Sequence, residues 1–288
     1  MEPEMIVDYV CYTGENPLWH PIEKLLYWID TRAQLYWFDP STGEHASYDM
    51  DQRHGGFTIQ PDGSLLLFRE NGNVALWRDG EVIETIIEEI PEERGARFND
   101  VIADPEGRVF CGMLPAEGSS KPGGLYRLDP DRTSTRVVDD IQLTNGLAFT
   151  PDHTGLYYTD TKVNRIYFFD YDRATGALSN QRIFSETVPE KDGMPDGMTV
   201  DSEGYVWSAR VGTSCLIRYA PDGSEERRVD FPTPQVTSLI FGGDDLTDIY
   251  VTTRGGHDKE PRDNFAGALF QINLGIKGLP EFYSRISV

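Results

Sequence analysis

The stretch DGMTVDSEGYVWSA, residues 196–209, contains the unit from which this chain is built. A short apolar strand runs from an acidic residue into a polar turn, and a second strand rich in aromatic and β-branched residues follows at once. Segments of the same form begin at five other places, at residues 15–21, 56–63, 99–107, 145–152 and 237–245. A spacing of roughly 40–50 residues between such segments indicates a repeat architecture.

Each unit contains further strands. In the second strand of each unit a large apolar or aromatic residue recurs at an equivalent position, at Tyr27, Leu66, Phe110, Tyr157, Trp207 and Tyr250. A third apolar strand follows in every unit, at 35–40, 74–80, 125–130, 166–172, 216–223 and 269–273, and a weaker fourth is visible at 81–87, 135–141 and 226–231. Short strands bounded by Asp-, Pro- and Gly-rich turns are typical of a propeller blade. The sequence therefore predicts an all-β, six-bladed β-propeller with four-stranded blades around a central channel.

We expect a single domain over residues 1–288, because no linker or change of composition divides the chain. A propeller protects its sheet edges when one terminus completes the blade formed by the other. Residues 5–11, MIVDYVC, precede the first inner strand by only a few residues. We therefore expect the N-terminal strand, at about residues 5–11, to be the outermost strand of the last blade.

One column of the repeat carries oxygen-rich side chains. When the six units are aligned on the residue that opens each turn, the position six residues earlier reads Glu15, Gly55, Asn99, Asn145, Asp196 and Thr237. Four of these are carboxylates or carboxamides. Equivalent positions in a ring of repeats meet at one axis, and converging oxygen ligands suit a hard cation. The column therefore predicts a metal site in the channel.

Composition excludes several classes of partner. The net charge is −22, which argues against nucleic acid and anionic membranes as partners, since both attract a basic surface. No apolar run is long enough to span a membrane, and the acidic N-terminus MEPEMIVDYV does not resemble a signal peptide. Cys11, Cys111 and Cys215 match no zinc spacing and are expected to be reduced thiols in a cytoplasmic protein. The oligomeric state is left open.

Several stretches together resemble the gluconolactonase family, which includes regucalcin (senescence marker protein 30) and luciferin-regenerating enzyme. They are GENPLW (14–19), RFND (97–100), LTNGLAF (143–149), PDGMTVDSEGYVW (195–207), TSLIFGGDDLTDIYVTT (237–253) and GALFQINLGIKGL (267–279). The resemblance covers every unit but the second. It implies a metal-dependent lactonase on a six-bladed propeller.

The resemblance also implies roles for individual residues. The metal ligands fall on Glu15, Asn145 and Asp196, and Asp196 is in addition the expected catalytic base. The substrate contacts fall on Arg97 and Asn99, and a contact to sugar hydroxyls falls on Glu117. The segment MLPAEGSSKPGG that contains Glu117 is shorter than in the animal proteins, which leaves the preferred sugar open. His54, next to Gly55, is either a pocket residue or a buried structural histidine.

These residue types suit ester hydrolysis on chemical grounds. Opening a lactone places negative charge on the carbonyl oxygen, which a divalent cation would stabilise, while a carboxylate such as Asp196 accepts a proton from the attacking water. An all-oxygen ligand set favours Ca²⁺, with Zn²⁺, Mn²⁺, Mg²⁺ and Fe²⁺ as alternatives. The planar Arg97 guanidinium can orient an oxygen-rich substrate.

The sequence thus predicts a metal-dependent hydrolase of sugar lactones such as gluconolactone or xylonolactone. Two alternatives remain open. The same site could serve a phosphotriesterase-like hydrolase, since a metal there would also polarise a phosphoryl oxygen. The chain could instead be a non-catalytic, calcium-binding regulatory propeller.

Overall fold

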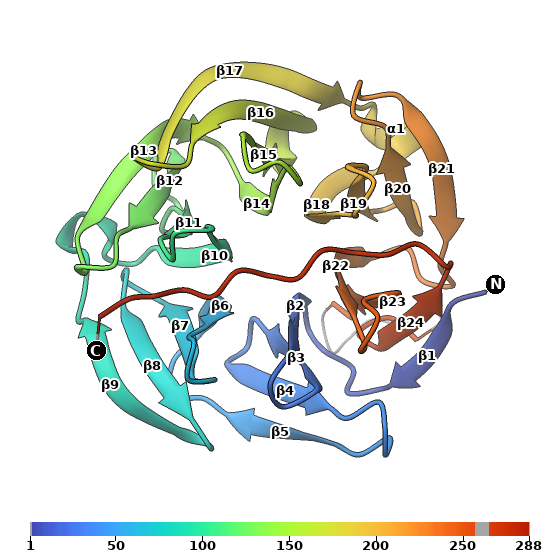
Figure 1. Ribbon diagram of the computed structural model, residues 1–288, viewed down its shortest axis with the longest axis horizontal. Helices are drawn as coiled ribbons and strands as arrows, with labels where there is room; N and C mark the ends of the chain where they lie inside the picture. The colour runs from blue at the N-terminus through green and yellow to red at the C-terminus, as the bar shows by residue number, and fades with distance from the viewer. Residues whose placement is uncertain (1, 257–264, 288) are drawn as a thin grey trace.

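The computed structural model describes residues 2–256 and 265–287. Over these residues the chain forms six four-stranded antiparallel sheets arranged as a ring around a central axis (Figure 1). The predicted six-bladed propeller is confirmed. In each blade the strands follow one another outward from the axis, as successive hairpins require.

The first three blades take up the first half of the chain. The first contains β2 (Gly14–His20), β3 (Leu25–Asp30), β4 (Gln34–Phe38) and β5 (His45–Asp49). The second contains β6 (His54–Ile59), β7 (Leu65–Arg69), β8 (Val74–Arg78) and β9 (Glu81–Ile87). The third contains β10 (Arg97–Ala103), β11 (Val109–Leu114), β12 (Gly123–Leu128) and β13 (Ser134–Ile141), after the short 3₁₀ helix η1 (Pro91–Glu93).

The other blades repeat this order. The fourth contains β14 (Thr144–Phe149), β15 (Gly155–Asp160), β16 (Arg165–Asp172) and β17 (Ala177–Glu186), with η2 (Thr161–Val163) between its second and third strands. The fifth follows the one-turn helix α1 (Pro189–Asp192) and contains β18 (Met194–Val200), β19 (Val206–Val211), β20 (Cys215–Tyr219) and β21 (Glu225–Asp230). The sixth contains β22 (Val236–Gly242), β23 (Asp248–Thr253) and β24 (Leu269–Asn273). No helix in the described part of the chain has the length and apolar character needed to cross a membrane.

The fourth strand of the sixth blade comes from the N-terminus. Strand β1 (Glu4–Val7) pairs antiparallel with β24, so an N-terminal strand completes the sheet that contains the last strand of the chain. The strand is shorter than the expected 5–11 and starts one residue earlier. The chain leaves the sheet after Val7, and Val10 adopts a left-handed backbone with φ 54°. The Cys11 N–H then donates to the Gly267 carbonyl at 2.9 Å, which directs the chain inward to β2.

The core lies between neighbouring blades. Aromatic residues of the second strands fill it, and Trp28, Tyr158 and Trp207 are almost fully buried. Trp28 stacks on Tyr36 with ring centroids 5.1 Å apart, and Trp207 meets Phe241 of the next blade edge-on at 6.1 Å. Each such contact joins strands or blades through a large apolar surface, which accounts for the aromatic phase of the repeat.

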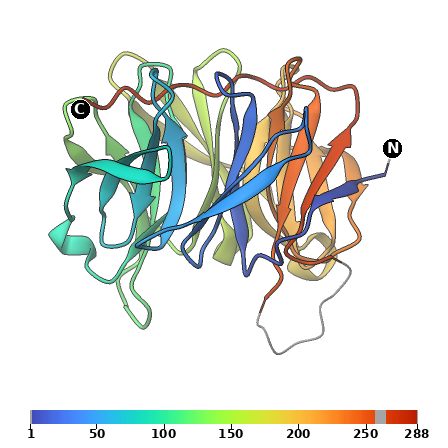
Figure 2. The same ribbon diagram turned by 90° about the horizontal axis from the view of Figure 1, so that it is seen from below.

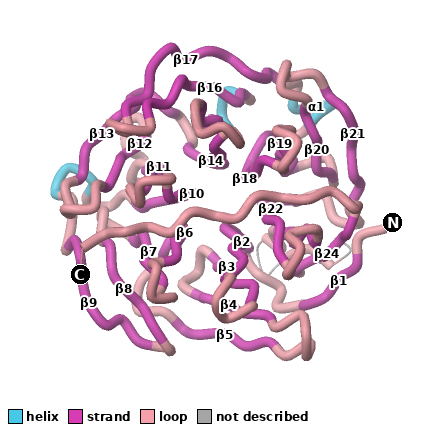
Figure 3. The backbone as a smooth tube through the Cα atoms, viewed as in Figure 1, coloured by secondary structure: helices cyan, strands magenta, loops and turns pink. Residues whose placement is uncertain are grey.

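After β24 the chain crosses one face of the ring as an irregular segment, which we call the C-terminal strap (residues 274–287). Figures 2 and 3 show it running over the face where the inner strands end. Its backbone is tied to several blades: Gly278 N–H donates to Leu246 O at 2.7 Å, Ser284 N–H to Ile59 O at 2.9 Å, and Arg285 N–H to Gly107 O at 2.8 Å. The strap therefore covers the end of the channel opposite the predicted metal site.

Candidate functional site

A β-bulge lies at the oxygen-rich column in all six inner strands. The pairing of each inner strand with its neighbour shifts register at the column residue or immediately beside it. A bulge re-aims the side chains around it and is common beside active sites. The six positions are thus structurally equivalent, as the alignment of the repeat predicts.

Two members of the column have structural roles. At Gly55 an added Cβ would lie 1.9 Å from the Phe98 carbonyl oxygen, so only glycine allows β6 and β10 to approach this closely. Thr237 uses its hydroxyl to donate to the Gly14 carbonyl at 2.6 Å, which ties the last blade to the first. The other four side chains, Glu15, Asn99, Asn145 and Asp196, are buried near the axis.

Three carboxylates are buried near the axis and influence one another electrostatically. Glu15, Asp196 and Asp100 are each no more than 7% exposed. Glu15 Oε2, Asp196 Oδ1 and Asp100 Oδ1 are buried without a hydrogen-bond partner in the described part of the protein. Burial raises the pKa of Glu15 and Asp196 well above the usual range, and the charges of the neighbouring carboxylates raise both further. Burial likewise raises the pKa of Asp100 to about 7.

Asn145 is held by a chain of hydrogen bonds. Its Nδ2 donates to the Thr161 hydroxyl at 2.7 Å, and that hydroxyl donates to the Pro195 carbonyl at 2.7 Å. Its Oδ1 accepts from Asn99 Nδ2 at 2.5 Å. This arrangement fixes the carboxamide with its oxygen away from Thr161, and the oxygen keeps a second lone pair for a ligand.

Asn99 connects Arg97 with Asn145. Arg97 Nη1 donates to Asn99 Oδ1 at 2.8 Å, and Asn99 Nδ2 also donates to the Thr144 carbonyl at 2.7 Å. Both ends of the Asn99 carboxamide are therefore engaged by protein groups. In this geometry Asn99 orients Asn145 and Arg97.

Positive charge flanks the carboxylates. Arg97 lowers the pKa of Glu15, while Arg254 and Arg97 lower that of Asp196, each against the larger effect of burial. His54 is fully buried beside Gly55, and burial lowers its pKa to about 4. Its Nε2 has no hydrogen-bond partner within the described ranges. His54 is therefore a neutral imidazole at this end of the channel.

Glu117 lies apart from the other predicted residues. It is exposed in a turn of the loop between β11 and β12, and none of the contacts found for the described residues joins it to the channel carboxylates, Arg97 or Asn99. Its assignment to substrate remains a prediction.

Asp100 is the site residue that sequence reasoning missed. It follows Asn99 directly, and in a regular strand neighbouring side chains point to opposite faces. The register shift between Phe98 and Val101 breaks this alternation. The sequence signal for Asp100 was its position in RFND, directly after the column residue Asn99. Other members of the column, Glu15 and Asp196, are also acidic.

The donor set fits a divalent cation. Three buried carboxylates with unpaired oxygens are costly unless they are protonated or neutralised by a cation. Among residues 2–256 and 265–287 no three Asp, Glu, His or Cys side chains converge at metal-ligand spacing. Two carboxylates and the oriented Asn145 carboxamide, which is outside that set of residue types, supply the oxygen donors that Ca²⁺ accepts.

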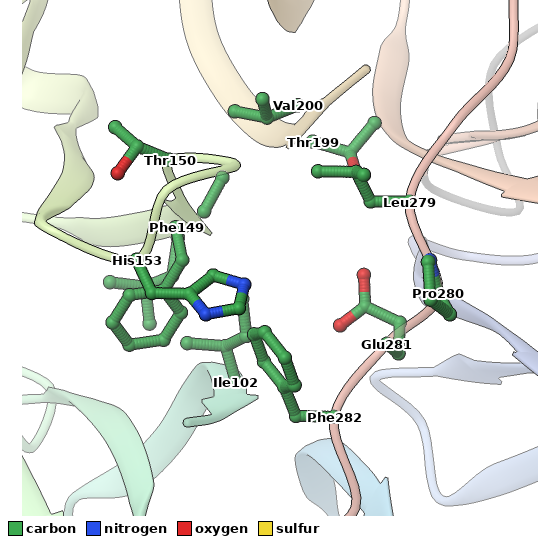
Figure 4. Close-up of a pocket in the computed structure, with 12 residues that line it drawn as sticks. Ile102, Phe149, Thr150, His153, Thr199, Val200, Leu279, Pro280, Glu281 and Phe282 are labelled. Atoms are coloured by element: carbon green, nitrogen blue, oxygen red, sulfur yellow. The ribbon is translucent and has the colours of Figure 1, made fainter. Parts of the chain in front are cut away.

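The other end of the channel is lined by the C-terminal strap. A narrow cavity of about 40 Å³ near the axis is lined by Asp100 on one side and by Glu281 of the strap on another. Glu281 also reaches a larger cavity of about 280 Å³, into which the His153 ring and Phe282 project from other walls (Figure 4). This cavity is mostly apolar, and burial raises the pKa of Glu281 to about 7.

The raised pKa of Glu281 has a consequence for stability. Between the ordinary carboxyl value and about 7, the folded chain binds more protons at this position than the unfolded chain, so stability decreases as pH rises through that range. Glu281→Gln removes the charge, and we expect it to stabilise the protein by about 2 kcal/mol at mildly alkaline pH and by little at mildly acidic pH. Denaturant unfolding at the two pH values measures this. Glu106→Gln, at an exposed carboxylate paired with Arg173, is the control, and an equal effect of Glu281→Gln at both pH values would contradict the burial effect.

Comparison with known proteins identifies relatives over nearly the whole chain. The chain is 45% identical over 290 residues to a pentonolactonase of Haloferax volcanii, covering 98% of this chain and 97% of that protein. It is 33% identical to regucalcin of Xenopus laevis, covering 96% of each. Among solved structures it resembles a luciferin-regenerating enzyme, with a TM-score of 0.88, 27% identity and coverage of 99% of this chain and 100% of that chain.

A second solved structure, described as a calcium-binding protein, regucalcin, from Agrobacterium tumefaciens, has the same fold. Its TM-score is 0.91 at 24% identity, over 99% of this chain and 98% of that one. The family model described as the SMP-30/gluconolactonase/LRE-like region matches residues 13–255, which span all six inner strands. The chain belongs to the SMP-30/gluconolactonase/LRE-like family.

Proposed function

We propose that this protein is a metal-dependent lactonase that opens sugar lactones of the gluconolactone and xylonolactone type. The observation that carries the proposal is the group of buried carboxylates with unpartnered oxygens at the propeller axis, beside a carboxamide fixed by hydrogen bonds. The 45% identity to a pentonolactonase over nearly the whole chain supports the same class of substrate.

Glu15, Asn145 and Asp196 would hold the cation, with Ca²⁺ favoured by the oxygen donors. When bound, the cation would stabilise the negative charge that develops on the lactone carbonyl oxygen. Asp196 Oδ1 has no partner within the described residues and is free to accept a proton from water. Burial of the site excludes bulk water from these groups, which strengthens each electrostatic interaction.

The surrounding residues would position the reacting groups. Asn99 holds the Asn145 carboxamide in place through its 2.5 Å hydrogen bond. Arg97, half-buried at the start of β10, would direct its remaining donors to the oxygens of a sugar lactone. Glu117, in the exposed loop after β11, would contact the sugar hydroxyls.

Metal binding tests the proposal directly. Glu15→Ala and Asn145→Ala each remove one oxygen donor, and we expect divalent-ion affinity to decrease by at least the roughly 10- to 100-fold seen when outer-shell partners of metal sites are changed. Calorimetry measures affinity, and proton release from an aldonolactone measures activity, which should recover partly at high metal concentration. Glu106→Gln changes an exposed carboxylate that pairs with Arg173, and it is the control. Unchanged affinity in both variants would refute the site.

The same assay separates the alternative functions. A chain that binds Ca²⁺ but shows no rate above spontaneous lactone hydrolysis would be the regulatory propeller instead. Metal-dependent hydrolysis of a phosphotriester without hydrolysis of aldonolactones would favour the phosphotriesterase-like reaction. Loss of lactonase activity on chelation, and its return with metal, is the result that the proposal requires.

Arg97→Ala is expected to raise the KM for a sugar lactone more than it lowers kcat for a small, unsubstituted lactone. The guanidinium has hydroxyl or ring oxygens to bind only in the larger substrate. Steady-state kinetics on both lactones measure the difference. Equal losses on the two substrates would mean that Arg97 acts through Asn99, to which it donates at 2.8 Å.

A further inference from the structure

An aromatic cavity of about 230 Å³ lies between the first and second blades, away from the channel carboxylates. Its walls include four aromatic side chains and two carboxylates, those of Tyr27, Trp37, Tyr48, Trp77, Glu23 and Asp79. We call it the interblade cavity. No role in the proposed lactone chemistry involves these residues.

The register of the first blade brings the aromatic residues to one face. Tyr27 of β3 is directly opposite Trp37 of β4. Leu35 of β4 is opposite Tyr48 of β5, which makes Tyr48 the diagonal neighbour of Trp37 on the same face. Trp77 of β8 reaches this face from the second blade and meets Tyr48 edge-on, with ring centroids 5.0 Å apart and planes at 70°. Two adjacent blades therefore contribute aromatic rings to one space.

Negative charge is present at the same cavity. The Tyr27 hydroxyl donates to Glu23 Oε2 at 2.6 Å, which holds that carboxylate beside the aromatic wall. Burial raises the pKa of Tyr27, and the charges of Glu23 and Asp79 raise it further, which places both carboxylates within electrostatic reach of its hydroxyl. Glu23 and Asp79 are themselves exposed, at the mouth of the cavity.

Basic groups near the cavity are engaged elsewhere. Arg78 is one of its lining residues, but its Nη2 bonds to the Asp62 carboxylate and to the Asp62 carbonyl. His20 Nε2 lies 2.9 Å from the Gly63 carbonyl and 3.9 Å from Glu23 Oε1. The cavity thus combines aromatic faces with two carboxylates, while the guanidinium that borders it is already paired.

We propose that the interblade cavity binds a small organic cation with a methylated ammonium group. Aromatic faces attract cations through the ring quadrupole, and quaternary ammonium groups are recognised by aromatic cages of this composition. The Glu23 and Asp79 carboxylates also attract a cation, and they disfavour binding of an anion. A methylated ammonium needs no hydrogen-bond acceptor, which suits a cavity with four aromatic side chains in its walls, whereas a metal ion would need converging oxygen ligands.

Titration calorimetry of the full chain with choline tests the proposal, with dimethylbutanol, the uncharged carbon isostere of choline, as the matched ligand. Choline should bind, and the isostere should bind about tenfold more weakly, since the two differ only in charge. Absence of choline binding, or equal affinity for the two ligands, would overturn the proposal. Equal affinity would identify the space as a simple apolar cavity.

Variants separate the aromatic and the charged contributions. Trp37→Leu removes an aromatic face and should weaken choline binding severalfold or more, while Trp37→Phe keeps an aromatic face and should retain most of the affinity. Glu23→Gln and Asp79→Asn change exposed side chains and should preserve the fold. Their choline affinities therefore test the site even if Trp37→Leu is unstable. Each should weaken choline binding and leave the isostere unaffected. Glu281→Gln, remote from this cavity, should change neither, and choline affinity that is unchanged in both acidic variants would overturn the proposed site.

Discussion

The Asp196→Asn variant should turn over a sugar lactone about 10² times more slowly than the wild type, or slower still, at saturating metal. Asparagine keeps the size of the side chain and one oxygen ligand, but it removes the negative charge and the basic lone pair. Asp196 is buried on β18, and its Oδ1 has no other hydrogen bond in the described structure that a carboxamide would lose. The variant should therefore fold and bind metal, though more weakly.

The decisive measurement is kcat for wild type and variant across a range of metal concentrations. A deficit that persists at saturation assigns the base to Asp196, whereas near-normal turnover there would mean that Asp196 is a ligand only. Thermal melting controls for folding. Thr161→Val, which removes the hydroxyl that holds Asn145, serves as a comparison, because it should weaken metal binding without removing a base.

The direction in which pH changes metal affinity and turnover can be predicted for the wild type and for Asp196→Asn. Without a cation, burial and the charge of Asp100 raise the pKa of Asp196, so protons compete with metal and apparent metal affinity should decrease as pH falls. An adjacent cation favours the carboxylate. At saturating metal the wild type should remain active at mildly acidic pH, and Asp196→Asn should lack the acidic limb of the profile.

The fold could be predicted because its repeat is visible in single residues. Tyr27, Tyr157 and Trp207 mark the second strand of their blades, and all three are buried. The column could be predicted for the same reason, since each member lies at a bulge that the repeat preserves. Asp100 could not, because the rule that side chains alternate along a strand fails at the bulge.

Features that belong to one part of the ring were less predictable. The strap has no counterpart in the other repeats, so nothing in the sequence indicates that Glu281 lines the closed end of the channel. The expected N-terminal strand was too long, since the left-handed backbone of Val10 depends on contacts with residues far along the chain, such as Gly267. The position of Glu117 depends on a loop whose conformation no repeat constrains.

One column of the repeat has a structural role that composition hides. This column contains the residue immediately before the one that opens each turn. Its place beside a polar turn suggests an exposed side chain, yet Asp104 and Asp201 are fully buried. Asp104 pairs with Arg108 at 2.7 Å and accepts from the Tyr171 hydroxyl at 2.7 Å. Asp201 accepts from the Glu203 and Tyr205 backbone N–H groups at 3.0 and 3.1 Å. These aspartates connect the turn to the blade interior.

Asp201 also holds two large side chains of the fifth blade. Its Oδ2 accepts from Trp207 Nε1 and from Arg218 Nε, both at 2.8 Å. Arg218 is 4% exposed and stacks on Tyr205, with its guanidinium carbon 3.8 Å from the ring centroid. Removing the carboxylate would leave the buried indole N–H without its acceptor and the guanidinium without its buried partner.

Asp201→Ala should therefore lower the free energy of unfolding by about 3 kcal/mol or more, the usual cost of breaking a buried ion pair on one side. In a chain of this size the melting temperature should decrease by roughly 6–12 °C. Asp170→Ala, which breaks the exposed pair with Arg182, is the control and should cost less than about 1 kcal/mol. In Asp201→Ala the buried Arg218 guanidinium keeps only its pairs with Glu203 and Glu226, which are more exposed than Asp201. Adding Arg218→Met removes the charge that has lost its buried partner, so the double variant should recover part of the loss. If the two substitutions are instead additive, the cost of Asp201→Ala comes from the Trp207 and backbone hydrogen bonds, and the ion pair with Arg218 contributes little to the stability of the fifth blade.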